Sequence, residues 1–114
     1  MKRIVSLAAV LAVAVVSLSA VAFAASNRAT ATTVTVKATE FKFALSKKSA
    51  PHGRVTFKVT NKGHVQHDFK IAGKKTKLLS PGKSATLTVT LKKGTYKYVC
   101  DPHASIMKGS FKVT

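Results

Sequence analysis

Apolar and polar residues alternate along most of the chain after residue 33, with the spacing of strands that bury one face. The inward positions fall into seven short runs: Val34, Val36 and Ala38; Phe41, Phe43 and Leu45; Val55, Phe57 and Val59; Val65, His67, Phe69 and Ile71; Ala85, Leu87, Val89 and Leu91; Tyr96, Tyr98 and Cys100; Phe111 and Val113. No sustained helical period appears among them. The pattern predicts an all-β domain, either a β-sandwich or a barrel.

Turn residues separate these runs. Clusters of Gly, Pro, Asn and Ser indicate turns at 49–53, 61–63, 72–74, 80–82 and 92–94. The outward positions are mostly Lys and Thr. In the segment 86–91 Thr alternates with Leu and Val without a break, so its register should be firmly specified.

The first 24 residues differ from the rest. Met1, Lys2 and Arg3 form a basic start, an apolar segment follows, and Ala22-Phe23-Ala24 matches a small-x-small cleavage site. This is the pattern of a helical secretory signal peptide, so we expect an exported protein, periplasmic or extracellular. An uncleaved anchor is the alternative, because about 20 apolar residues can span a bilayer. Residues 25–32 are expected to be a flexible lead-in, and residues 33–114 the folded domain.

Composition limits the function classes. The 114 residues carry 20 Lys and Arg against 3 Asp and Glu, a net charge of +17. The leader holds two basic residues and no acidic one, so its removal leaves +15. One cysteine excludes an internal disulfide framework. Three carboxylates leave little scope for glycosidase or two-metal carboxylate chemistry.

The candidate chemistry lies near the C-terminus. Cys100 ends a predicted strand on its inward side, His103 follows three residues later, and Met107 four residues after that. Thiolate and thioether are soft sulfur donors and imidazole is a nitrogen donor, and together they suit copper and related metals. Pro102 stiffens the loop between the first two. A small buried hydrophobe at Cys100, an exposed loop residue at His103 and core packing at Met107 are the alternatives.

A further ligand must come from elsewhere in the chain. His67 shares the inward spacing of Phe69 and Ile71, so it is the preferred candidate. His64 follows Gly63 in a turn and is expected to face solvent, which makes it the second choice. His52 lies in another turn and is assigned no role.

These motifs resemble the cupredoxins, the plastocyanin and azurin family of exported type 1 (blue) copper proteins. Residues 96–103 (YKYVCDPH) resemble the family's aromatic-x-aromatic-x-Cys-x-Pro-His run, and Met107-Lys108-Gly109 resembles its Met-x-Gly. An Asn-x-Gly turn at 61–63 precedes His67, as in the family. The resemblance covers residues 33–114 and implies a Greek-key β-sandwich or barrel. It also implies one copper ion bound by His67, Cys100 and His103, with Met107 as the weak axial ligand.

Two departures from the family pattern stand out. Asp68 follows the first ligand, where the family often has Asn, so the hydrogen bonds that fix the ligand loop are expected to change. A carboxylate near the copper is also expected to lower its reduction potential. The loop combines a plastocyanin-like Cys-to-His spacing with an azurin-like His-to-Met spacing. An apolar shell of Phe43, Phe69, Tyr98 and Ile106 is expected around the metal. The resemblance also implies an electron port at the His103 edge, surrounded by Gly63, Pro102, Ala104 and Ile106.

The function expected from these features is one-electron transfer, not enzymatic catalysis. The partners would be redox proteins with acidic docking surfaces, or an anionic cell envelope, because the domain is strongly basic. Nucleic acid is not expected, since no aromatic-basic stripe accompanies the charge. The domain is expected to be a monomer. A copper-delivery module and an exported scaffold with a vestigial site remain open, with a Cys–His nucleophilic enzyme as a more distant alternative.

Overall fold

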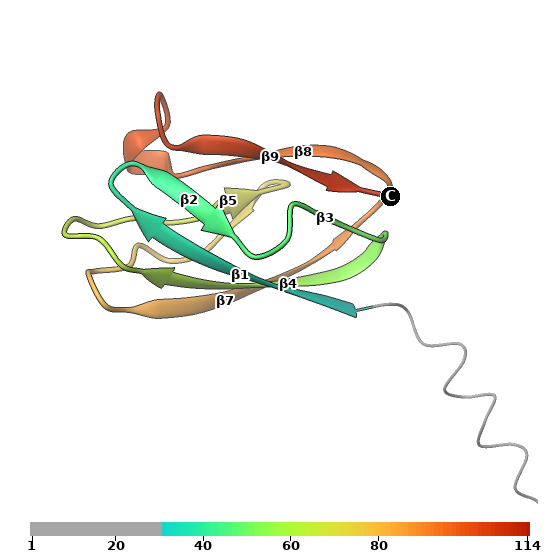
Figure 1. Ribbon diagram of the computed structural model, residues 1–114, viewed down its shortest axis with the longest axis horizontal. Coiled ribbons are helices and arrows are strands. Elements are labelled where there is room, and N and C mark those ends of the chain that lie inside the picture. Colours follow the sequence, from blue (N-terminus) through green and yellow to red (C-terminus); the bar gives the residue numbers. More distant parts are fainter. Residues whose placement is uncertain (1–30) are drawn as a thin grey trace, which may run out of the picture.

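The computed structural model describes residues 31–114, which form two β-sheets packed face to face (Figure 1). One sheet has the order β2-β1-β4-β7, with strands Lys42–Leu45, Ala31–Thr39, Gly53–Asn61 and Ser84–Leu91. The other has the order β3-β9-β8-β5-β6, with strands Ser49–Ala50, Lys108–Val113, Gly94–Val99, Lys70–Ile71 and Lys74–Lys75. A single 3-10 turn, η1 (Asp101–His103), links β8 to β9 within this region. The expected all-β sandwich is confirmed.

Both sheets contain parallel and antiparallel neighbours. In the first sheet β1 runs parallel to β4, and β4 runs antiparallel to β7. In the second, β3 runs parallel to β9, and β9 runs antiparallel to β8. The parallel β1–β4 pair joins strands that are not hairpin neighbours, so the segment between them must cross to the other sheet and return. This crossing places β3 at the edge of the second sheet.

The core lies between the sheets and follows the predicted parity. Register pairs such as Val34 with Phe57 and Val36 with Val59 place the apolar side chains of β1 and β4 on one face, where all four are buried. The Phe57 ring packs against Phe69 of the other layer, with centroids 5.1 Å apart. Burying one such side chain contributes about 1.5–3 kcal/mol, so the packing between the two sheets contributes much of the stability.

Two predicted inward positions are wrong. Phe41 is 42% exposed and Val65 is 41% exposed. Phe41 lies in the turn between β1 and β2, which interrupts the alternation that its neighbours follow. Val65 lies in a loop, because the Asn61 side chain donates a hydrogen bond to the Val65 carbonyl and keeps this segment out of a strand.

The predicted strand over 65–71 is correspondingly shorter. His67 forms only an isolated bridge with Leu79, and the regular strand β5 begins at Lys70. The residues His67, Phe69 and Ile71 are nevertheless buried, as their spacing predicts. Burial here comes from side-chain packing, not from a continuous ladder.

The predicted turns are largely confirmed. Ala72 and Gly73, with φ of 52° and 78°, form the two-residue connection of the β5–β6 hairpin. Two positive φ values are the mark of a type I′ turn, which suits the twist of antiparallel strands. The segment 49–53 is a partial exception, since it contains the two-residue strand β3.

The expected leader (1–24), with its signal helix, and most of the expected lead-in (25–32) lie outside the described residues. β1 begins at Ala31. Across 31–114, the structure has no helix of the length and apolarity needed to cross a membrane.

One end of the sandwich gathers three connections that are distant in sequence. The β1–β2 turn, the loop after β4 and η1 lie together on the left of Figure 1, and the C-terminus lies at the opposite end. Contacts between residues 40 and 64 and between residues 41 and 103 agree with this arrangement. All of the predicted ligand residues belong to this end or border it.

Candidate metal centre

His67, Cys100 and His103 converge at this end of the molecule. The Cys100 sulfur lies 3.8 Å from Nδ1 of His67 and 3.5 Å from Nδ1 of His103. The three candidate ligand atoms all lie within 4.8 Å of one another. Cys100 and His67 are buried, and His103 is half-buried with one side toward solvent.

These separations suit a small metal ion. Metal–nitrogen and metal–sulfur bonds of about 2.0 and 2.3 Å, at tetrahedral to trigonal angles, require nitrogen and sulfur to lie roughly 3.5–3.7 Å apart. The observed distances of 3.5 and 3.8 Å match that requirement. Two imidazoles and one thiolate form a donor set typical of copper or zinc.

Met107 completes the set of predicted residues. It is fully buried and packs in one cluster with Cys100 and Ala38, against which Phe43 also lies. The four side chains His67, Cys100, His103 and Met107 are therefore positioned to form a copper site.

Backbone hydrogen bonds close the loop that carries three of these residues. The Cys100 N–H donates to the Met107 carbonyl at 3.0 Å, and the Met107 N–H donates to the His103 carbonyl at 2.9 Å. The His103 N–H donates back to the Cys100 carbonyl at 3.0 Å. Pro102 occupies the first turn of η1, where its missing N–H costs nothing. The loop is thus internally braced.

The thiol of Cys100 is kept in its protonated form by its surroundings. Burial raises the pKa of Cys100, and the nearby charge of Asp68 acts in the same direction. A metal binds the thiolate, so binding must displace this proton.

The loop that carries His67 is organised by Asn61. The buried Asn61 amide donates to the carbonyls of Val65 and Leu79, each at 2.8 Å, and its oxygen accepts the Gly63 N–H at 2.8 Å. The bridge between His67 and Leu79 then fixes the ligand backbone. The sequence indicated a turn here, but not that the Asn side chain builds it.

Asp68 keeps the loops together in spite of the departure from the family pattern. It is 4% exposed, and its Oδ1 accepts the Asp101 N–H at 2.8 Å. Asp68 is expected from the sequence to alter the hydrogen bonds that fix the ligand loop. This bond is nevertheless present, because a carboxylate oxygen accepts an N–H as an amide oxygen would.

The remaining histidines lie apart from the cluster. His64 is exposed, as expected. His52 is also exposed and lies 3.1 Å from the Thr114 carbonyl through its Nδ1.

The apolar surroundings differ in part from expectation. Phe43 packs against the cluster, and it contacts Phe69 and Tyr98 with ring centroids 5.2 and 5.6 Å away. Ile106 is wrong as a member of this inner shell, since it is 59% exposed. It lies on the outer side of the short loop, where no other element covers it.

The surface around His103 also differs in part from the expected set of residues. Pro102, Ala104 and Ile106 are exposed, but Gly63 is buried beneath the Glu40 carboxylate. Phe41 takes its place, with its ring centroid 4.8 Å from that of His103 and 6.4 Å from that of His67. Sequence reasoning placed Phe41 in the core and so missed this contact.

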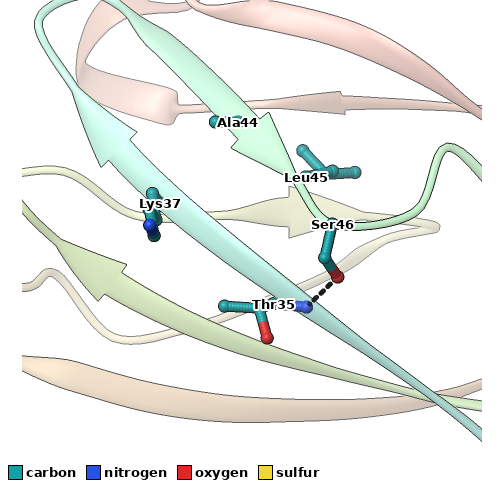
Figure 2. Close-up of a pocket in the computed structure, with 5 residues that line it drawn as sticks. All are labelled: Thr35, Lys37, Ala44, Leu45 and Ser46. Atoms are coloured by element: carbon teal, nitrogen blue, oxygen red, sulfur yellow. Dashed lines mark hydrogen bonds between the residues drawn. The ribbon is translucent and has the colours of Figure 1, made fainter.

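A hollow on the molecule lies away from this chemistry. It is lined by Thr35, Lys37, Ala44, Leu45 and Ser46 of β1, β2 and the residue after β2 (Figure 2). The Thr35 N–H donates to the Ser46 hydroxyl across it at 2.8 Å. None of the predicted ligands contributes to this hollow.

A model of a cupredoxin-like domain matches residues 7–113. The chain belongs to this cupredoxin-like family. No curated protein matches it in sequence. Among solved structures, auracyanin B is 24% identical, with a TM-score of 0.63 over 73% of this chain and 88% of that one. The resemblance to cupredoxins is confirmed at the level of the family.

Two further structures share the cupredoxin fold. Auracyanin A, a blue copper protein of Chloroflexus aurantiacus, is 19% identical, with a TM-score of 0.62 over 75% of this chain and 100% of that one. A reduced mutant of amicyanin is 20% identical, with a TM-score of 0.59 over 72% of this chain and 82% of that one. At these identities the likeness concerns the fold.

Proposed function

We propose that this cupredoxin is a one-electron carrier with one type 1 copper ion, bound by His67, Cys100 and His103 and more weakly by Met107. The convergence of one thiol and two imidazole nitrogens within 4.8 Å supports this most directly. A trigonal His-His-Cys set with a long axial Met is the donor set of blue copper centres. Auracyanin A, which shares the fold, is described as such a protein.

The chain would contribute a ligand frame that changes little between oxidation states. Bound copper supplies the Cu(II)/Cu(I) couple. The braced 100–107 loop and the Asn61 network restrict where the ligands can move. The buried Cys100 and the adjacent Phe43 keep water from the sulfur. Small rearrangement on electron transfer lowers the barrier to that transfer.

Electrons would pass through the half-buried edge of His103. Phe41 lies over the His103 ring, and the exposed Ile106 belongs to the same loop. Val65 lies on the neighbouring ligand loop and is also exposed. An apolar rim around a partly exposed ligand permits close approach of a partner without desolvating charges.

The partners would be redox proteins with acidic surfaces, or an anionic envelope surface. The carboxylates of this basic chain lie at the metal end: Glu40 contacts His67, Asp68 accepts the Asp101 N–H, and Asp101 pairs with Lys75 at 3.2 Å. The rest of the described surface is therefore cationic. Opposite charge on a partner would speed encounter, and salt would slow it.

Two other functions differ from electron transfer in how the protein would treat copper. A copper-delivery module would bind the metal in a relaxed geometry, and a scaffold would not retain it. We do not propose an enzyme, because Cys100 and His103 share one tight loop and point at a common centre.

The visible spectrum of the copper-loaded protein tests the proposal. We expect intense absorption from thiolate-to-copper charge transfer, lost in Cys100→Ser and His67→Ala. Reversible one-electron reduction should accompany it. Copper retained without this absorption would favour delivery, and failure to retain stoichiometric copper would favour the scaffold.

His64→Ala is the matched control. It removes an exposed imidazole three residues from His67 and should leave the absorption unchanged. If His64→Ala removed the colour and His67→Ala kept it, the ligand assignment would be reversed.

We further propose that residues 1–24 are a cleaved signal peptide, that residues 25–32 are a lead-in and that the monomeric domain works outside the cytoplasm. The basic start, apolar run and Ala-Phe-Ala site support this. The intact mass of the protein from the envelope fraction tests it, because cleavage after Ala24 removes a defined mass.

A further inference from the structure

The β1–β2 turn contributes the side chain of Glu40 to the metal end, a contact that no sequence motif predicts. One oxygen of Glu40, Oε1, accepts the His64 N–H at 2.8 Å and the Val65 N–H at 3.2 Å. The same oxygen lies 3.0 Å from Nε2 of His67. A single carboxylate therefore contacts both the backbone of the ligand loop and a candidate ligand imidazole.

This contact determines which His67 nitrogen carries the proton. An ionised carboxylate accepts hydrogen bonds and donates none, so Nε2 must be the N–H that faces it. The other nitrogen, Nδ1, then presents its lone pair, and it lies 3.8 Å from the Cys100 sulfur. His67 is fully buried, so bulk water does not compete for either nitrogen.

We propose that Glu40 is a positioning residue of the metal centre, which orients His67 as the Nε2–H tautomer so that Nδ1 faces the metal. The inference deepens the proposed function. Its copper measurements depend on that function, whereas the tautomer of His67 in the metal-free protein does not. Glu40 does not contact the metal position; it acts through the imidazole.

The loop is shaped to admit this carboxylate. A Cβ atom on Gly63 would overlap Glu40 Oε1, so no side chain at that position is compatible with the observed contact. Gly63 is buried, and its N–H is already bonded to Asn61. The absence of a side chain thus serves the close approach of Glu40.

The charge state of Glu40 agrees with this role. Its Oε1 accepts two backbone N–H groups of the ligand loop, and a carboxyl group ordinarily has a pKa of about 4.3. The carboxylate is therefore anionic at neutral pH. A carboxylate behind a ligand histidine makes that ligand more basic, and loss of such a partner reduces metal affinity by about 10- to 100-fold.

A loop-capping role without any effect on the ligand must be distinguished from positioning. Glu40→Gln retains an oxygen that accepts the three N–H groups but removes the charge. Glu40→Ala removes both. Asp101→Asn is the matched control for charge, because it neutralises a carboxylate at the same end that pairs with Lys70 and Lys75 instead of a ligand.

Nitrogen NMR of the metal-free protein at about pH 8, above the ordinary histidine pKa of about 6.5, gives the first readout. We expect the Nε2–H tautomer of His67 in the wild type and in Glu40→Gln, and a mixture in Glu40→Ala. Gly63→Ala, which displaces the carboxylate, should behave as Glu40→Ala does. This second variant keeps the test decisive if Glu40→Ala does not fold.

Copper measurements give the second readout. The reduction potential should rise in Glu40→Gln by more than in Asp101→Asn. The negative charge of Glu40 stabilises Cu(II) through His67, and the Gln variant removes that charge. Copper affinity should fall about 10-fold or more in Glu40→Ala. A wild-type Nδ1–H tautomer, an unchanged tautomer in Glu40→Ala, or equal potentials in Glu40→Gln and Asp101→Asn would overturn the inference. If copper shows no redox behaviour at all, the proposed function fails while the NMR result still decides the role of Glu40.

Discussion

At the scale of single residues, the metal end depends on a few buried polar side chains with several bonds each. Asn61 makes two hydrogen bonds within the ligand loop and a third to Leu79, and Asp68 joins that loop to the residue after Cys100. Among the described residues no buried side-chain nitrogen or oxygen lacks a partner. Because an unpaired buried polar group costs about 1–3 kcal/mol, such a network resists rearrangement.

Acid should weaken the contribution of Glu40 to folding. Its pKa is about 2 in the folded protein against an ordinary 4.5, so its stabilisation is complete above pH 4.5 and disappears as the pH falls toward 2. We expect the melting temperature of the metal-free wild type to exceed that of Glu40→Gln near neutral pH. The gap should narrow below pH 4.5 in thermal unfolding followed by circular dichroism. A gap that stays constant down to pH 2 would contradict this.

At the scale of elements, the regular strands supply the core and the irregular connections carry the ligands. β1, β4 and β7 form a long, well-registered ladder that supplies buried apolar surface. The second sheet has shorter strands at one side, and its β5–β6 hairpin is only two residues long on each strand. The loop that carries His67 runs from β4 into this less regular sheet, and the 100–107 loop joins two of its strands, so both need hydrogen bonds of their own.

The β5–β6 turn offers a way to raise stability. Ala72 adopts φ 52°, a left-handed conformation that costs a residue with a Cβ about 1–2 kcal/mol. Ala72→Asn gives the Asn-Gly pair favoured in type I′ turns. Asn tolerates the left-handed conformation better than Ala, so we expect the variant to recover about 0.5–1 kcal/mol of that cost in the free energy of unfolding, measured by urea denaturation.

Ala72→Val is the matched control for this turn. A β-branched side chain tolerates positive φ poorly, so the variant should be less stable than the wild type. Ala72 is exposed and lies outside the ligand loops, so the copper spectrum should be the same in both variants. Equal stability of the three proteins would show that the turn is not strained.

At the scale of the whole molecule, one face of the second sheet carries a row of exposed lysines. Lys97, Lys108 and Lys112 alternate across β8 and β9 on the outer face of the second sheet, where their register partners are Ser110, Val99 and Thr95. All three lysines are exposed. Within residues 31–114 the ion pairs involve Lys70 and Lys75 instead, so this lysine face is free to meet an anionic partner.

Replacing these three lysines by Gln should weaken binding to an acidic polypeptide such as polyglutamate. At about 0.5 kcal/mol per exposed ion pair, the loss is about tenfold at low salt, and salt should reduce it. The control replaces Lys37, Arg54 and Lys58, which carry the same charge on the first sheet. Equal losses in both variants would mean that net charge alone matters and that the lysine face has no special role.

Local patterns in the sequence are enough to predict the sheet-forming strands and most residues of the candidate site. Period-two alternation is a local property of each strand, so the buried sides of β1, β4, β7 and β9 could be predicted directly. Cys100, His103 and Met107 lie within eight residues, so their proximity also follows from local spacing. The spacing of His67 relative to Phe69 and Ile71 predicts its burial, although its segment is mostly loop.

The surroundings of His67, in contrast, depend on how distant segments pack together. Glu40 lies 27 residues away in sequence, and Phe41 is distant from His103 as well, so neither contact follows from any local pattern. The parallel pairing of β1 with β4 carries the β1–β2 turn to the metal end, and that placement depends on how the two sheets pack. Alternation along a strand specifies which face is buried, but not which distant turn will lie above it.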